Sequence, residues 1–156
     1  MSTLAMIRQR CLLLNGARAV EPGFLDEVQS HLGLELADDF REAAEFFDGS
    51  GIYVLPLHAI GWAPAPNVLD ETRRLRERAG LARQFLVLAQ PPASLIVMDC
   101  SGGGGRVIWC DDVDVCRLGR EALLTAPDSW PTYTAFLEYL ISEEQQDRVN
   151  LPDDKA

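Results

Sequence analysis

The sequence predicts an α+β domain in which a single antiparallel sheet of about 4–6 strands is flanked by helices. Two observations support this class. Apolar residues recur at helical spacing in the first half of the chain and again near its end. Between these segments, residues 85–118 hold short apolar runs separated by proline, glycine and aspartate. With 156 residues, of which 47% are hydrophobic, the chain is expected to form one domain over residues 1–156.

Three helical segments are expected before residue 50. Residues 1–20 are compatible with a helix that is interrupted at Asn15-Gly16, and a short helix follows over 24–32. The third segment has acidic residues on one helical face and apolar residues on the other, namely Phe40, Ala43, Ala44 and Phe47. We expect Gly49 and Gly51 to end this helix, because glycine adopts the left-handed backbone common at helix C-termini. The β-branched and aromatic run at 52–57 then predicts a strand.

The second half begins with a proline-rich loop over 61–66, after which Asn67 is placed to cap a helix that continues through residue 79. Strands are expected from the apolar runs that follow, at 85–88, 95–98, 107–109 and 113–118. Their even spacing favours an antiparallel meander. Pro131 is expected in the first turn of a final helix, whose apolar face comprises Phe136, Leu137, Leu140 and Ile141. We expect the polar residues 150–156 to form a mobile tail.

The formal net charge of −10 is the most unusual bulk property of the chain. From Asp26 to Asp48 there are eight acidic residues against Arg41 alone. Such a field repels the phosphates of nucleic acids, so direct nucleic-acid binding is not expected. It attracts a basic protein and accelerates the encounter with it. An acidic surface also keeps proteins in solution, which is the alternative explanation of the charge.

The sequence indicates a cytoplasmic protein without a membrane anchor. No segment approaches the roughly 18 consecutive apolar residues of a transmembrane helix. The apolar run at 11–14 is too short for a signal sequence. Four cysteines in a chain without such a signal indicate reduced thiols.

The motifs typical of enzymes are missing from the sequence. Gly49-Ser50-Gly51 lacks the glycines two residues on either side of the serine that a nucleophile elbow requires. The glycines at 102–105 are not followed by the Lys-Ser/Thr of a phosphate-binding loop and indicate a flexible turn. The cysteines have no C-x₂-C spacing, so we expect no metal and no cofactor. The expectation is a protein that is not an enzyme; the alternative is a thiol enzyme that pairs Cys100 or Cys110 with His58.

The stretch Leu-Glu-Leu-Ala-Asp-Asp-Phe at 34–40 leads a helix to Phe-Phe-Asp-Gly at 46–49, and Leu-Pro-Leu follows at 55–57. In these residues and in the order of its elements, the chain resembles the SMI1/KNR4 (SUKH) superfamily over about residues 24–144. Family members typically show Leu-Pro and Asn-Gly where this chain has Leu-Ala at 36–37 and Asp-Gly at 48–49. The resemblance implies a non-catalytic binding domain with a peripheral N-terminal segment and a peripheral tail at 146–156. Many bacterial members of the family are immunity proteins that bind a cognate toxin, often a nuclease or a deaminase.

We therefore expect a monomer or weak homodimer that binds and neutralises a basic, nucleic-acid-targeting toxin, because an acidic inhibitor can take the place of phosphates. The alternative is a regulatory or scaffold module of the same fold whose partner is not a toxin. Trp62 lies in the proline-rich loop and is the tryptophan best placed for exposure. The candidate partner-binding residues lie in loops or at the ends of helices and strands. They are Asp48, Trp62, Asp70, Glu71, Asp111, Asp112 and Asp114.

Overall fold

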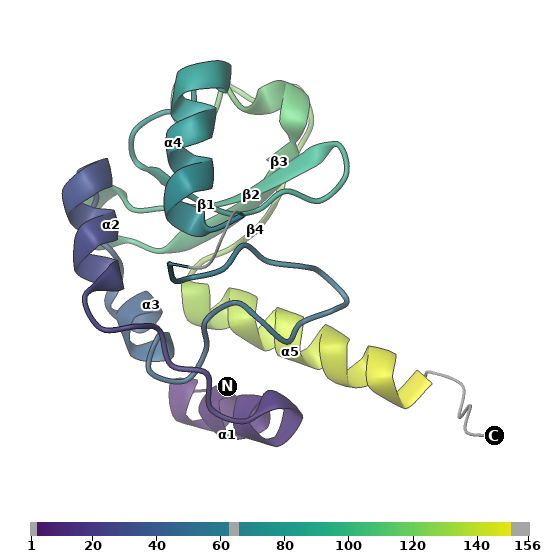
Figure 1. The fold of residues 1–156 in the computed structure, drawn as a ribbon. Coiled ribbons are helices and arrows are strands. Elements are labelled where there is room, and N and C mark those ends of the chain that lie inside the picture. The colour runs from purple at the N-terminus through teal and green to yellow at the C-terminus, as the bar shows by residue number, and fades with distance from the viewer. Residues whose placement is uncertain (1–2, 63–65, 151–156) are drawn as a thin grey trace.

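The computed structural model describes residues 3–62 and 66–150 and confirms the α+β class (Figure 1). The helices and strands of these residues are α1 (Leu4–Asn15), α2 (Phe24–Leu32), α3 (Asp38–Ala43), α4 (Val68–Ala79), β1 (Phe85–Ala89), β2 (Ser94–Asp99), β3 (Arg106–Asp111), β4 (Asp128–Trp130) and α5 (Tyr133–Asn150). Two short 3₁₀ turns, η1 (Ser101–Gly103) and η2 (Asp112–Asp114), flank β3. None of the described helices combines the length and the apolar composition needed to cross a bilayer.

The sheet is an antiparallel meander in the order β1-β2-β3-β4. Its three longer strands coincide with the predicted runs at 85–88, 95–98 and 107–109. In the centre of the sheet, Val97 of β2 pairs with Val87 on one side and with Ile108 on the other. Short connections join β1 to β2 and β2 to β3, as the spacing of those strands predicts, whereas residues 112–127 separate β3 from β4.

Both faces of the sheet are covered, which explains why its strands are nearly continuous apolar runs. One face, with Leu86, Met98 and Val107, belongs to the main core formed with α1, α2, α3 and α5. The opposite face, with Val87 and Val97, packs in a smaller core on residues 81–82 and 115–118. Figure 1 shows α1, α3 and α5 below the sheet and α4 beside β1.

Helix α4 covers the open edge of the sheet. Asn67 caps it as predicted, because its Oδ1 accepts the backbone N–H of Asp70 at 2.9 Å. One turn further along, the Thr72 hydroxyl accepts the N–H of Val87 in β1 at 2.9 Å. An edge strand whose amide is bound in this way cannot pair with another chain at that point.

Helix α5 begins at Tyr133 and continues to Asn150, beyond the predicted apolar face. Its cap is Thr132, whose hydroxyl accepts the N–H of Ala135 at 3.1 Å, so Pro131 precedes the helix and does not lie in its first turn. The predicted apolar face is fully buried; its residues are Phe136, Leu137, Leu140 and Ile141. Of the predicted tail, only Asn150 is among the described residues, and it ends α5.

The predicted strand at 52–57 is wrong, because this segment has no strand partner. The backbone N–H groups of Tyr53 and Val54 instead donate to one carboxylate oxygen of Glu144 at 2.8 and 2.9 Å. Pro56 has no N–H to offer. The segment still buries Ile52 and Leu55, so its apolar residues reflect burial and not a sheet ladder.

Two other boundaries differ from prediction. Helix α3 ends at Ala43, so Gly49 lies in the loop that follows and does not end the helix. Residues 113–118 form turns, because the Asp114 carboxylate accepts the N–H groups of Leu124 and Thr125 and folds the chain back on itself. The fourth strand is the three-residue β4, which the apolar pattern did not indicate.

Candidate protein-binding groove

The seven candidate residues lie in three places, and one of these is a hollow in the surface. Asp48 and Trp62 line the same hollow. Asp70 and Glu71 lie in the first turn of α4. The remaining three aspartates follow one another at the end of β3 and in η2.

Two adjoining hollows form what we call the acidic groove. The first has a volume of about 430 Å³ and lies between the segment at 19–23, the start of α2, and α3 with the two residues after it. The second has a volume of about 310 Å³ and is lined by Asp48 and residues 59–62. Ala19 and Glu21 line both hollows, so the groove runs continuously from α3 to Trp62.

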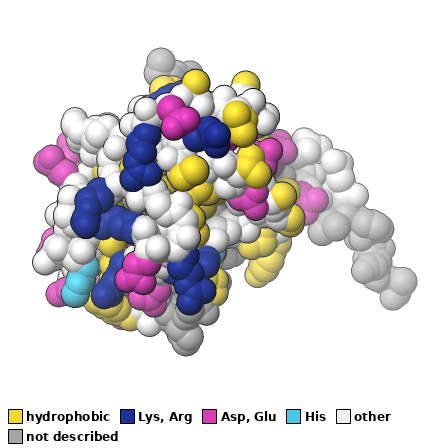
Figure 2. All heavy atoms as spheres, turned by 90° about the horizontal axis from the view of Figure 1, so that it is seen from above, with side chains coloured by type: hydrophobic (Ala, Val, Ile, Leu, Met, Phe, Trp, Pro, Cys, Tyr) yellow, Lys and Arg dark blue, Asp and Glu magenta, His cyan; other side chains and the backbone are white. Residues whose placement is uncertain are grey.

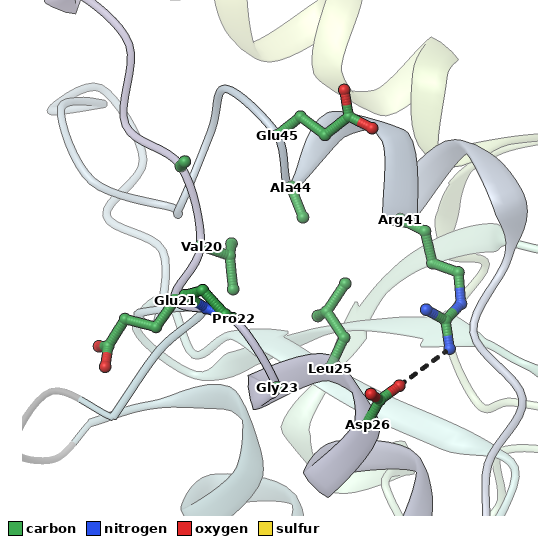
Figure 3. A pocket seen from close by; sticks show the side chains of 10 residues that line it. Val20, Glu21, Pro22, Gly23, Leu25, Asp26, Arg41, Ala44 and Glu45 are labelled. Atoms are coloured by element: carbon green, nitrogen blue, oxygen red, sulfur yellow. Dashed lines mark ion pairs between the residues drawn. The ribbon is translucent and has the colours of Figure 1, made fainter.

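The first hollow has an apolar floor and a charged rim (Figure 3). The floor is formed by Val20, Leu25 and Ala44. The backbone N–H of Val20 donates to the Ala44 carbonyl at 2.8 Å, and this hydrogen bond joins the segment at 19–23 to the residues that follow α3. On the rim, Arg41 of α3 and Asp26 of α2 approach each other to 3.8 Å. In Figure 3, Glu45 stands on the other side of the floor from this pair, and the Glu21 side chain points away from both. Glu21 also lines the second hollow.

The second hollow is organised around Trp62, whose side chain is 50% exposed. The indole packs edge-on against Phe24 with ring centroids 4.9 Å apart, and the backbone N–H of Trp62 donates to a carboxylate oxygen of Glu21 at 3.3 Å. Asp48 closes the opposite wall, where its carbonyl accepts the Ile60 N–H at 2.8 Å. The tryptophan is therefore held in place while half of its surface stays open to a partner.

Gly49 allows the loop of Asp48 to approach the segment at 58–60. Its backbone φ is +90°, a conformation that residues with a side chain rarely adopt. A Cβ atom at this position would lie 2.7 Å from the His58 carbonyl oxygen. The turn is completed by Asp48, whose carboxylate accepts the Ser50 N–H at 3.0 Å. The glycine that sequence reasoning assigned to a helix end thus shapes the wall of the groove.

Four carboxylates, from Glu21, Asp26, Glu45 and Asp48, line the groove, and the Arg41 guanidinium lies near that of Asp26. Sequence reasoning placed Asp48 and Trp62 in the site but missed the other three acids. Asp26 and Glu45 belong to the acidic run at 26–48, and only the packing of α2 beside α3 brings them to one hollow. No sequence signal marks Glu21, which lies between helices.

The remaining candidates are bound within the fold to different degrees. Glu71 is largely buried, and its carboxylate accepts hydrogen bonds from Arg74 and Gln90. Burial opposes ionisation of Glu71, but these hydrogen bonds outweigh it and lower the pKa of the carboxyl. Asp70 is exposed and accepts a hydrogen bond from the Asn67 amide at 2.8 Å.

At the end of β3, Asp111 is half-buried and Asp112 is exposed. Asp114 differs from both because it is 0% exposed. Its carboxylate accepts hydrogen bonds from the backbone N–H groups of Leu124 and Thr125. Asp114 therefore stabilises this loop, and its buried carboxylate is not accessible to a partner.

Among the described residues, no hydrogen bond joins His58 to Cys100 or Cys110. His58 has its Nε2 atom 2.8 Å from the Gln90 amide nitrogen, and burial lowers the pKa of the ring. Burial also raises the pKa of the Cys100 thiol to about 12 and that of the Cys110 thiol to about 11, so little thiolate forms near neutral pH. Over residues 3–62 and 66–150, no group of His, Cys, Asp and Glu side chains is arranged to hold a metal ion.

The sequence matches no protein-family model, and no curated protein matches it significantly. The functional argument therefore depends on the residues of this chain and on their geometry. The acidic groove is the feature that combines an open hollow, concentrated charge and an exposed aromatic side chain.

Proposed function

We propose that this chain is an immunity-type protein of the SMI1/KNR4 kind that binds a basic toxin in the cytoplasm and blocks it. The observation that carries the proposal is the acidic groove, in which four carboxylates from separate segments line two adjoining open hollows, one of them beside Trp62. Charge of this density favours a basic protein surface and accelerates the encounter with it. The protein then acts by occupying a surface of its partner, without chemistry of its own.

The groove has the two components expected of a protein-binding site. Trp62 is half exposed, so a large part of its aromatic surface is accessible to a partner. Tryptophan is among the residues that contribute most to binding when a partner covers them. The carboxylates around it would accept charge-assisted hydrogen bonds from lysine and arginine. A toxin that acts on nucleic acid needs a basic surface for its substrate, and the groove would compete with phosphates for that surface. The protein itself is proposed to act as a monomer or weak homodimer without direct nucleic-acid contact.

The test compares capture by the wild-type chain with capture by two groove variants, Glu45→Lys and Trp62→Ala. Asp147→Lys is the matched control, because Asp147 is an exposed acid near the end of α5 and lies outside the groove. Each protein is immobilised and exposed to a lysate of the native host, and the captured proteins are identified. The captured protein is then expressed with and without the chain in a growth assay.

The proposal expects a basic protein that is captured by the wild type and by Asp147→Lys and is lost with both groove variants. Expression of this protein alone should arrest growth, and co-expression of the wild-type chain should restore it. A groove-dependent partner that is harmless when expressed alone would replace the toxin proposal with the scaffold alternative. Capture that is equal for all four proteins would overturn the groove as the binding site.

A further inference from the structure

We propose that His58 is a pH-sensitive latch: its neutral ring holds the segment at 57–62 against β1 and α4, and protonation of the ring releases it. The latch is a property of the chain alone and goes beyond the proposed function. It consists of a polar cluster outside the groove, formed by His58, Glu71, Arg74 and Gln90. His58 is only 9% exposed, so these side chains and little solvent surround its ring.

The amide of Gln90 has one orientation that satisfies its neighbours. Its nitrogen donates to the Oε1 atom of Glu71 at 2.7 Å, and its oxygen accepts from the Nη2 atom of Arg74 at 3.0 Å. A flipped amide would set its oxygen against the carboxylate and its nitrogen against the guanidinium, so that acceptor would meet acceptor and donor would meet donor. Glu71 and Arg74 therefore fix the amide nitrogen on the side of Gln90 that faces His58.

This orientation determines the protonation state of the His58 ring. The Gln90 nitrogen lies 2.8 Å from the Nε2 atom of the ring, and an amide nitrogen can only donate. Nε2 must then accept, which means that the ring is neutral and carries its proton on Nδ1. A protonated ring would set an N–H against the N–H of Gln90, and the hydrogen bond would be lost.

Burial of the His58 ring is the main effect that lowers its pKa below the ordinary value of 6.5. Of the charged groups on α4, Glu71 raises this pKa and Arg74 lowers it. Figure 2, which looks down on α4, shows arginine side chains gathered on this side of the molecule. On the α5 side, Tyr133 lines a small cavity with His58 and stays neutral, because burial raises the pKa of its hydroxyl.

The ring holds a segment that shapes the groove. The His58 N–H donates to the Leu88 carbonyl at 2.9 Å, and the Ile60 N–H donates to the Asp48 carbonyl at 2.8 Å. Residues 59–62 line the second hollow together with Asp48. Loss of the hydrogen bond at the ring removes one anchor of this segment, so its backbone should open more often. The stabilisation is complete above pH 6.5 and is lost as the pH falls from there to the lower pKa of the folded state.

The test uses the ¹⁵N-labelled full-length chain without a partner. Long-range ¹H–¹⁵N spectra of the imidazoles at pH 7.5 report which ring nitrogen carries the proton. Amide hydrogen exchange at pH 7.5 and at pH 5, expressed as protection factors, reports how often the segment opens at His58 and Ile60. His58→Gln places a neutral acceptor near the position of Nε2 and does not titrate. His31→Gln is the matched control, because His31 is exposed on α2.

We expect the proton of neutral His58 on Nδ1. From pH 7.5 to pH 5, the protection factors at His58 and Ile60 should fall by roughly twofold to tenfold, which is the effect of one hydrogen bond on an opening equilibrium. The fall should remain in His31→Gln and disappear in His58→Gln. Gln90→Met removes the donor that selects the neutral ring, so it should raise the pKa of His58 and lower the protection at pH 7.5.

Three results would overturn the inference. The first is a proton on Nε2 of the neutral His58 ring, which would show that Gln90 does not donate to it. The second is wild-type protection at His58 and Ile60 that is equal at the two pH values. The third is an equal fall in His58→Gln, because the titrating group would then lie elsewhere. The first two results come from the wild type, so they decide the inference even if a variant does not fold, and the proposed function keeps its own test because no partner is present.

Discussion

The strongest stability prediction concerns Glu144, a carboxylate that is 1% exposed and ties together three parts of the fold. Its Oε1 atom accepts the N–H groups of Tyr53 and Val54, and its Oε2 atom accepts from Arg148 at 2.9 Å. Arg148 in turn donates to the Leu14 carbonyl at the end of α1 at 3.2 Å. Glu144 thus holds the 51–54 segment and, through Arg148, the end of α1 against α5.

We expect Glu144→Gln to lower the free energy of unfolding at pH 7 by about 3 kcal/mol, because it removes the charge of a buried carboxylate that accepts three hydrogen bonds, and a hydrogen bond to a charged group contributes about 1.5–3 kcal/mol. For a domain of this size the loss corresponds to a melting temperature lower by roughly 6–12 °C. Burial opposes ionisation of Glu144, but hydrogen bonds from Val54, Arg148 and Tyr53 outweigh it, so the pKa of the carboxyl falls below its ordinary value of 4.5. A carboxyl whose pKa is lower in the folded state contributes its full stabilisation above pH 4.5. That contribution disappears as the pH falls through the lower, folded-state pKa.

Urea unfolding at pH 7 and at pH 3, followed by circular dichroism, measures both effects. Glu143→Gln is the matched control, since Glu143 is the exposed neighbour on the same helix and should change stability by less than about 0.5 kcal/mol. The difference between wild type and Glu144→Gln should shrink at the lower pH. Equal stabilities of the two variants at pH 7, or a difference for Glu144→Gln that does not depend on pH, would refute the reasoning.

Three further predictions concern the loops and the thiols. Asp114→Ala should cost about 2 kcal/mol in urea unfolding because it leaves two loop amides without their acceptor, whereas Asp112→Ala, which removes an exposed side chain, should cost less than about 0.5 kcal/mol. Gly49→Ala should cost more than about 1 kcal/mol, because it adds a contact at 2.7 Å with the His58 carbonyl to the strain of a positive φ; a melting temperature equal to wild type would contradict the turn geometry. In native protein at pH 8, Cys116 should react with a thiol reagent first, since it is exposed and the other three cysteines are buried, and mass mapping that finds another modified site first would contradict this order.

Much of the fold follows from local patterns. The cap at Asn67 and the three longer strands lie where the sequence places them, because capping and apolar runs are properties of neighbouring residues. The segment at 52–57 has the composition of a strand but no strand partner. Its amides are satisfied by Glu144, about 90 residues away in the chain, and no local pattern reports such a contact.

The groove shows the same division. Asp48 and Trp62 were recognisable because they lie in a loop with turn residues and carry chemistry typical of binding. Glu45 was one acid among many in an amphipathic helix, and its place on the rim depends on how α2 and the segment at 19–23 pack beside α3. Asp114 looked equivalent to Asp112 in the sequence, although the fold buries one and exposes the other.

The sequence by itself determined the class of the domain, the cap at Asn67, the three longer strands and the excess of acidic residues, because each depends on composition or on residues close together in the chain. Only the tertiary structure decided which of those acids are available to a partner. The carboxylates of Glu144 and Asp114 accept hydrogen bonds from backbone amides, and that of Glu144 also from Arg148, inside the fold. Asp26 and Glu45 are exposed and line an open hollow. The physical reason is that segments distant in sequence decide how deeply a carboxylate is buried and which donors surround it. Acidic residues that look alike along the chain therefore differ in their exposure and hydrogen bonds once the chain has folded.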